Sequence, residues 1–301
     1  GRRPPLTGCP LGSRLGIIRE EGACVRARQT LLPPVPRVRT YLPVADGSLR
    51  AVPVEIRGAW RSGYPADRND GMLWSGRGLS ASVSGGLQAR WGRHALVLAP
   101  EVARSANRSF LLPDTVSPGW SPYVDPWATP GLDRYLRPGE GPLTSWGWGD
   151  SYLEAGVGPT RVGLSTERLW WGPARRYPLL FSGAGPGFPH LYAESDGEVG
   201  LGPGGLRLRA LGGHLDESSW FDADAGNDRR LLAAAQAAWR LGFVPGLEVA
   251  LSVVRHEPLP DGGVGALRWM QLLTGDPDGE LPERRGSGMG SFSFRLEPQL
   301  N

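Results

Sequence analysis

The stretch "LSASVSGGLQARW", residues 79–91, decides the fold class of this chain. Its odd-numbered positions carry apolar residues and one glycine and end at a tryptophan, whereas its even-numbered positions carry serine, glycine, glutamine and arginine. Successive side chains of a β-strand point to opposite faces, so this period of two predicts a long strand with one apolar face. A turn at 92–93 leads into "HALVLAPEVARSAN", residues 94–107, which we expect to return as the paired strand.

The same alternation recurs along the chain. It occurs in "RRLLAAAQAAWRLGF" (229–243), of which residues 231–241 are rich in alanine and leucine and could also be a helix, but the apolar residues there are too continuous for a period of 3.6. Pro245–Gly246 then makes a turn into another alternating segment, which favours a β-hairpin. The further alternating segments are "DSYLEAGVG" (150–158), "RVGLSTERLWW" (161–171), "GGLRLRALGGHLDE" (204–217), "LEVALSVVRHE" (247–257) and "SFSFRLE" (291–297).

The length of these segments indicates a membrane protein. Strands of about ten residues exceed the usual five or six of globular sheets and suffice to cross a membrane at a tilt. We therefore predict an all-β fold over residues 41–301, an antiparallel transmembrane β-barrel with about 10–14 strands present. The alternative is a soluble β-sandwich with polar outer faces. An aromatic girdle at the strand ends would consist of Trp91, Trp170, Trp239 and Phe243.

Composition narrows the function further. Among 301 residues the chain has 45 glycines, 29 prolines and 12 tryptophans, as many short turns and apolar–polar interfaces would require. The net charge of +3 includes no dense basic run, so we expect no nucleic-acid partner. No apolar stretch is long enough for a transmembrane helix.

Residues 1–40 are rich in proline and arginine and predict a separate N-terminal segment that is poorly ordered or periplasmic. Cys9 and Cys24 within this segment could form a disulfide.

The sequence does not point to an enzyme. Asp150 and Glu154 resemble an acid–base pair, but on a strand they lie about 13 Å apart, beyond the roughly 5–9.5 Å that a glycosidase pair needs. The four histidines are scattered, and "DADAGND" (222–228) lacks the complete calcium-loop pattern. We therefore expect no catalytic residue, no metal site and no cofactor.

The segment "LSTERLWWGPARRYPLLFSGAGPGFPHL", residues 164–191, resembles the central signature of the capsule assembly protein Wzi family. The upstream "NDGMLWSGRGLSASVSGGLQARWG", residues 69–92, is similar to the first barrel strands of that family. The resemblance covers roughly residues 56–296, and its distinctive part is 165–191. The matching positions are Glu167, Trp170, Trp171, Gly172, Pro173, Leu179, Leu180, Phe181, Ser182, Phe188 and Pro189.

The resemblance implies a monomeric, non-enzymatic bacterial outer-membrane barrel of about eighteen strands with a small helical periplasmic element. It implies that capsular or extracellular polysaccharide and outer-membrane lipid are the partners, and that no cofactor is needed. The chain departs from the family at "SGAG" (182–185), where paired asparagines are usual, in its smaller number of strands, and in its non-aromatic end. We therefore expect a fragment, or a chain that does not complete its own barrel.

The Trp-Trp-Gly-Pro stretch supplies the candidate binding site. Adjacent strand residues point to opposite faces, so one of Trp170 and Trp171 would anchor in the lipid interface and the other would stack on a sugar ring. Arg175 and Arg176 would bind carboxylates of an acidic polysaccharide, with Glu167 completing the site. The alternative is a purely structural corner, for which Gly172, Pro173 and Pro189 are the turn residues. The alternative functions are a general porin and a soluble secreted β-sandwich lectin or glycosidase.

Overall fold

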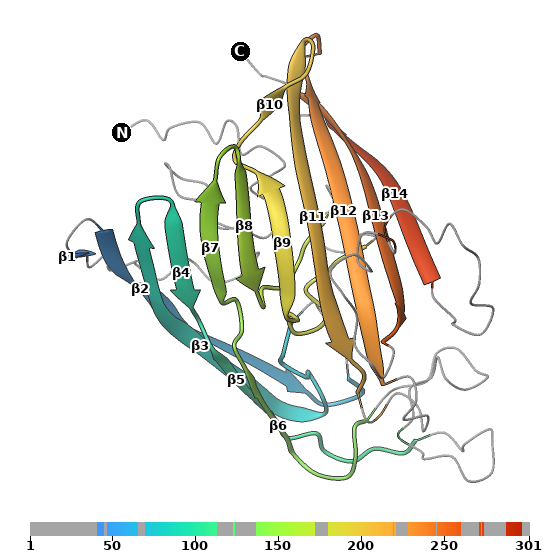
Figure 1. The fold of residues 1–301 in the computed structure, drawn as a ribbon. Helices are drawn as coiled ribbons and strands as arrows, with labels where there is room; N and C mark the ends of the chain where they lie inside the picture. Colours follow the sequence, from blue (N-terminus) through green and yellow to red (C-terminus); the bar gives the residue numbers. More distant parts are fainter. Residues whose placement is uncertain are drawn as a thin grey trace, which may run out of the picture.

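The computed structural model describes residues 41–44, 47–65, 70–112, 123, 137–171, 180–218, 220, 228–244, 246–259, 271, 273 and 287–296. These residues form one curved antiparallel sheet of 14 strands, as Figure 1 shows. The N-terminal segment 1–40, with both cysteines, lies outside the described residues. Within the described part of the chain, no helix is long and apolar enough to cross a membrane.

The strands follow one another mainly as hairpins. Their bounds are β1 (Tyr41–Val44), β2 (Gly47–Arg61), β3 (Gly78–Trp91), β4 (His94–Leu98), β5 (Glu101–Ser105), β6 (Leu143–Gly147), β7 (Tyr152–Val157), β8 (Thr160–Ser165), β9 (His190–Ser195), β10 (Val199–Gly200), β11 (Gly204–Asp216), β12 (Arg229–Leu241), β13 (Leu247–Pro258) and β14 (Ser287–Leu296). The order across the sheet is β1-β2-β3-β4-β7-β8-β9-β11-β12-β13-β14, with β5 between β3 and β6 and with β10 on β11. Along this path β1 and β14 are the two end strands, and β6, which pairs only with β5, ends a branch, so the sheet formed by the described strands is not closed.

The structure confirms the all-β, antiparallel fold and several predicted strands. Residues 79–91 lie in β3, and the helix alternative for 231–241 is wrong, since β12 and β13 pair along their length. The returning strand 94–107 is two strands, because β4 and β5 both pair with β3 and are separated at Ala99–Pro100. The predicted strand 161–171 is wrong beyond Ser165, where β8 ends and the chain turns onto the inner face of the sheet.

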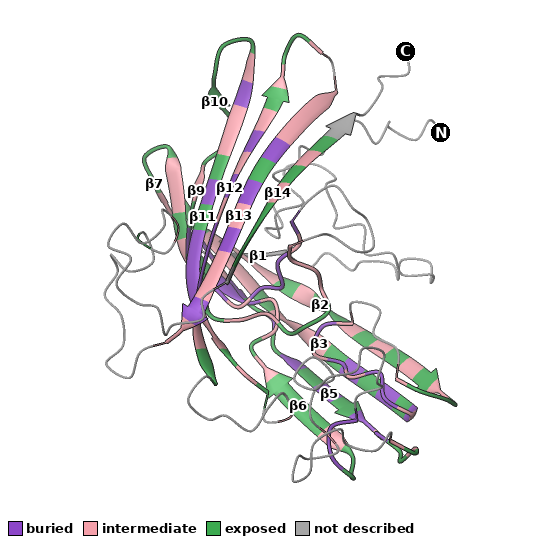
Figure 2. Ribbon diagram, turned by 90° about the vertical axis from the view of Figure 1, so that its right-hand side faces the viewer, coloured by how far each residue is buried: buried purple, intermediate pink, exposed green. Residues whose placement is uncertain are grey.

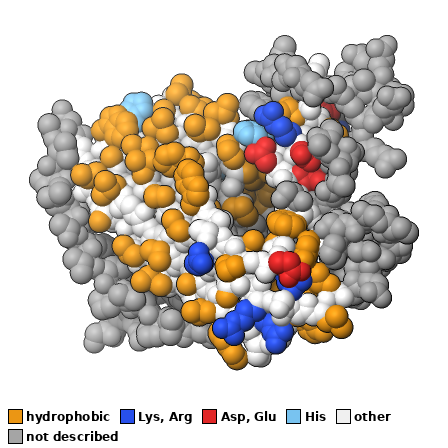
Figure 3. All heavy atoms as spheres, turned by 90° about the horizontal axis from the view of Figure 1, so that it is seen from below, with side chains coloured by type: hydrophobic (Ala, Val, Ile, Leu, Met, Phe, Trp, Pro, Cys, Tyr) orange, Lys and Arg blue, Asp and Glu red, His pale blue; other side chains and the backbone are white. Residues whose placement is uncertain are grey.

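Buried and exposed residues alternate along the long strands, as Figure 2 shows, and many of the buried positions are polar whereas the exposed ones are apolar. In β3, Ser80 and Ser82 are buried whereas Leu79 is 62% exposed. In β12 and β13, Gln236 and Ser252 are buried and hydrogen-bonded to each other, whereas Leu251 is 63% exposed. The polar face is therefore the inner face and the apolar face is the outer one. Figure 3 shows hydrophobic side chains spread over the surface seen from below, with charged side chains gathered in small groups.

The connections between strands divide by length. Short turns join β1 to β2, β3 to β4, β7 to β8, β10 to β11 and β12 to β13. Long connections join β2 to β3 (62–77), β5 to β6 (106–142), β8 to β9 (166–189), β11 to β12 (217–228) and β13 to β14 (259–286). Since neighbouring strands are antiparallel, these short turns join the strands at one end, here the turn end, and the long connections leave and re-enter the strands at the other, the loop end, toward the bottom of Figure 1.

Candidate functional site

The segment that follows β8 folds back onto the inner face of the sheet. The Thr166 amide donates to the Ser151 carbonyl at 2.9 Å, and the Thr166 hydroxyl donates to the Gly149 carbonyl at 2.9 Å. The Ser165 hydroxyl accepts from the Glu167 amide at 2.9 Å, as in a capped turn. These contacts to the chain before β7 end the strand, so Trp170 and Trp171 do not lie in a strand.

The first part of the site is the inner aromatic cluster, made of Trp171, Phe181, Phe188, His190 and Tyr192. Successive ring centroids are 5.0, 6.4, 5.0 and 6.2 Å apart, and Trp171 meets Phe181 edge to face. Trp171 is only 2% exposed. Such geometry adds to the burial of large apolar area and favours rigid packing. The cluster packs on the inner faces of β11, β12 and β13 through Leu211, Ala234 and Val254.

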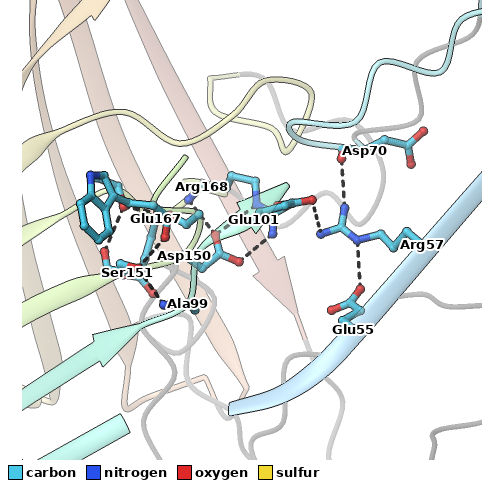
Figure 4. Close-up of polar contacts among 12 residues, drawn as sticks. Glu55, Arg57, Asp70, Ala99, Glu101, Asp150, Ser151, Glu167 and Arg168 are labelled. Carbon is cyan, nitrogen blue, oxygen red and sulfur yellow. Dashed lines mark hydrogen bonds and ion pairs between the residues drawn. The ribbon is translucent and has the colours of Figure 1, made fainter. Parts of the chain in front are cut away.

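The second part is the inner charge cluster, made of Glu55, Arg57, Glu101, Asp150 and Arg168 (Figure 4). The Arg168 guanidinium donates to Asp150 through two bonds, Nε to Oδ1 at 3.1 Å and Nη2 to Oδ2 at 2.7 Å. Glu101 lies between the two arginines, with Oε2 3.8 Å from Arg168 and Oε1 3.5 Å from Arg57, whose Nε donates to Glu55 at 3.0 Å. A planar guanidinium matched to a carboxylate by two bonds gives a strong, directional clamp.

Burial and neighbouring charges shift the pKa of Arg168 in opposite directions. Burial removes water from the guanidinium and by itself lowers its pKa. The hydrogen bonds and negative charge of Asp150, with the charge of Glu101, outweigh burial, so the pKa of Arg168 lies above its ordinary value. Arg168 therefore remains a permanent cation inside the protein.

The inner charge cluster joins the two stretches that carry the family resemblance. Arg57 donates to the Asp70 carbonyl at 3.0 Å, and the Ser75 hydroxyl donates to the Asp70 carboxylate at 2.8 Å. The Gly71 amide donates to the Gly183 carbonyl at 2.7 Å. Residues 70–75 and the β8–β9 connection, far apart in the sequence, therefore meet on the inner face.

Gly71 is placed where a side chain would disturb this contact. Its φ is +70°, and a Cβ there would lie 2.3 Å from Nη1 of Arg168. We expect Gly71→Ala to lower the free energy of unfolding by about 1–2 kcal/mol, because the left-handed backbone is strained for alanine, and to weaken the Arg168–Asp150 clamp. Urea titration of the folded chain measures the change.

Two glycines serve as controls for this substitution. Gly63→Ala meets no atom within 4 Å and should change stability by less than about 0.5 kcal/mol. Gly92→Ala has a φ of +53° and open space, so it carries the backbone strain alone. If Gly71→Ala cost no more than Gly92→Ala, the close approach to Arg168 would have no energetic importance.

The site residues that the sequence predicts differ in burial, and only some of them are among the described residues. Glu167 and Trp171 are buried, and the Ser165 hydroxyl donates to the Glu167 carboxylate at 3.3 Å. Trp170 is half-buried and Pro189 is exposed beside the start of β9. The remaining residues, Gly172, Pro173, Arg175 and Arg176, lie outside the described residues, so a sugar contact by this set stays a prediction.

Sequence reasoning did not single out Arg57, Glu101 or Arg168, and it considered Asp150 only together with Glu154. The structure gives these carboxylates separate partners, since Asp150 binds Arg168 whereas Glu154 binds Arg161 at 3.0 Å and the Tyr192 hydroxyl at 2.9 Å. The available signal was the presence of charged side chains on the polar faces of the predicted strands. That signal predicts an ionic interior but not its pairs.

Comparison with known proteins does not identify a function for this chain, so a function has to be inferred from the geometry of the site. No family model, no curated protein and no solved structure matches this chain. Within the described residues, no group of three or more histidine, cysteine, aspartate or glutamate side chains could hold a metal ion.

Proposed function

We propose that this chain forms the wall of a bacterial outer-membrane β-barrel that binds capsular or extracellular polysaccharide at the cell surface. The observation that carries the proposal is the inverted burial of the sheet, with leucine, valine and phenylalanine outward and serine, glutamine and charged side chains inward. A soluble protein rarely exposes so large a contiguous apolar surface, whereas a lipid-facing wall requires it. The exposed outward residues include Ile56, Leu79, Val83, Leu87, Leu153, Leu164, Leu191, Leu208, Leu251, Phe292 and Phe294.

Strand length and connection length support the same proposal. Strands β11, β12 and β13 have 13, 13 and 12 residues, enough to cross the hydrocarbon at a tilt. Outer-membrane barrels have short periplasmic turns and longer extracellular loops. The division into a turn end and a loop end follows this pattern and supports our placing the loop end at the cell exterior.

Outward aromatic side chains near both ends of the sheet are a further support. Trp91 and Phe243 are exposed near the turn end and Trp60 is exposed near the loop end, whereas the exposed Trp146 lies level with Val83 in the middle of β3. Tryptophan and phenylalanine at these heights suit the two membrane–water interfaces. Trp239 is half-buried on β12, and Trp170 has left the strand, so these two contribute less to such a girdle than the sequence predicted.

The polysaccharide-binding part of the proposal depends on the resemblance of residues 164–191 to the capsule assembly family and on the packed inner face. The inner aromatic cluster packs on the inner side of β9, β11, β12 and β13. An inner face covered by packed side chains favours a binding role over the diffusion channel of a general porin.

The proposed membrane placement is tested by purification. We expect the chain to require detergent for solubility and to migrate faster on gels before heating than after, as folded barrels do. A compact monomer in plain buffer without detergent would contradict the membrane placement.

The binding half is tested on immobilised bacterial polysaccharides, both acidic and neutral, with the chain in detergent micelles. We expect the double variant Arg175→Ala, Arg176→Ala to bind acidic polysaccharide about tenfold more weakly. Each substitution removes a guanidinium that would donate a charged hydrogen bond to a sugar carboxylate. Arg229→Ala is the matched control, because Arg229 is an exposed arginine at the start of β12. Equal binding by the double variant and the control would remove these arginines from the site.

A further inference from the structure

Aromatic side chains from separate long connections meet at the loop end. Tyr64 from the β2–β3 connection packs edge to face on Phe110, with ring centroids 5.4 Å apart. Tyr123 packs edge to face on Trp220 from the β11–β12 connection, with centroids 5.6 Å apart. Arg137 joins the two pairs, because its Cζ lies 5.4 Å from the Phe110 ring and 5.6 Å from the Tyr123 ring. We call these five residues the loop-end row.

The row is held in place by buried hydrogen bonds. Arg137 is only 5% exposed, and its Nη2 donates to Glu140 at 2.9 Å. The Tyr123 hydroxyl also donates to Glu140. Asn107, almost fully buried, donates to the Pro138 carbonyl at 2.7 Å and to the Gly141 carbonyl at 3.0 Å, and so fixes the turn that carries Glu140.

Two features of this support are unusual for simple packing. Asn107 has a φ of 42°, a strained conformation of the kind found at functional sites. The Arg137 Nε donor and the Asn107 Oδ1 acceptor are buried and have no hydrogen-bond partner among the described residues. An unsatisfied buried group of this kind is costly, and a hydroxyl-bearing ligand that reached it would offset the cost.

We infer that the loop-end row binds hexose units of a neutral stretch of polysaccharide. The inference rests on the proposed function, which assigns the loop end to the cell exterior. Tyr64 is 50% exposed and Trp220 is half-buried, and aromatic rings present flat apolar faces to the C–H faces of sugar rings. Glu140, with its side chain 67% exposed, can accept hydrogen bonds from sugar hydroxyls.

The charges of the row favour a neutral sugar over an acidic one. The positive charge of Arg137 is already matched by Glu140 at 2.9 Å, so the row offers no unmatched cation to a sugar carboxylate. An acidic sugar would instead meet the exposed carboxylate of Glu140, and like charges repel. The row therefore differs in specificity from the arginine pair at 175–176.

The test measures the affinity of the detergent-solubilised full chain for dextran, a neutral glucan, and for alginate, an acidic polysaccharide. Tyr64→Ala should weaken dextran binding roughly tenfold by removing a stacking face. Glu140→Gln should weaken dextran binding and strengthen alginate binding, because the charge of Arg137 becomes unmatched; a purely structural role would not shift this preference. Leu111→Ala is the control, because Leu111 lies in the β5–β6 connection that also carries Glu140 and is 90% exposed. It should change neither affinity.

The outcomes separate this inference from the proposed function. Dextran binding that is equal in wild type, Tyr64→Ala and Glu140→Gln would show that the row only packs the loops, and would leave the polysaccharide role intact. Binding of alginate alone, unchanged by both substitutions, would also overturn the inference. Binding of neither polysaccharide by the correctly folded wild type would count against the polysaccharide role itself. Heat-modified gel mobility identical to wild type verifies folding of each variant.

Discussion

Leu251→Arg should lower the free energy of unfolding of the chain in a lipid bilayer by about 2–4 kcal/mol, the cost of arginine at the bilayer midplane. Leu251 lies within β13 (Leu247–Pro258), faces outward opposite Phe292 of β14, and is 63% exposed. If the outer face meets hydrocarbon, the guanidinium must leave water. If the outer face meets water, the same substitution on an exposed position changes stability by less than about 0.5 kcal/mol.

The measurement is urea titration of folding into phosphatidylcholine vesicles, followed by tryptophan fluorescence and by gel mobility without heating. Leu111→Arg is the matched control, since Leu111 is a leucine that is still more exposed but lies in a long connection outside the strands. It should be neutral in both cases. A Leu251→Arg variant as stable as the Leu111→Arg variant would contradict the lipid-facing wall.

Local alternation predicted the longest strands well because it depends only on neighbouring residues. β3 spans almost the predicted residues, and β12 and β13 form the predicted hairpin around 242–246. Alternation alone, however, does not tell which face meets the solvent, because a sandwich with a polar exterior produces the same period of two. In the structure the two faces are told apart by burial, with Ser80 and Ser82 buried and Leu79 exposed, and this burial depends on the packing of distant segments onto one face, which no single strand encodes.

β2 escaped prediction because its alternation changes phase. Leu49 and Ala51 face outward at odd positions, opposite Ala89 and Leu87 of β3. After an irregularity between Val52 and Glu55, the outward residues are at even positions, beginning with Ile56. A bulge adds a residue to one strand, and Pro53 lies within it, so the apolar pattern appears broken in the sequence while the strand continues.

β8 was predicted too long for the opposite reason. The alternation of residues 161–171 continues in the sequence, but the strand ends at Ser165, where its partner β7 begins at Tyr152. Beyond that point Arg168 binds Asp150, which comes before β7 in the chain. A pairing between residues this far apart overrides local preference, and the inner charge cluster has the same origin, since it joins side chains from β2, β5 and two connections.

Trp171→Ala should lower the free energy of unfolding by about 3–5 kcal/mol, the usual cost of removing a buried tryptophan. Trp171 is 2% exposed, packs edge to face on Phe181 and contacts the cluster that includes Leu211 and Val254. The cavity left behind lies between the β8–β9 connection and the sheet, so the connection should also become more accessible to protease. Trp170→Ala, at the half-buried neighbouring position, should cost markedly less.

The comparison of both variants with Trp171→Phe decides what Trp-Trp-Gly-Pro does at the end of β8. A packing role predicts that phenylalanine restores most of the stability, since it returns most of the apolar volume to the cavity. The folded fraction of Trp171→Phe should then bind polysaccharide as wild type does, because a side chain enclosed by protein does not stack on a sugar. If Trp171→Ala kept wild-type stability in urea titration but lost polysaccharide binding, Trp171 would be a ligand contact, and the interior position of its ring would have to open for binding.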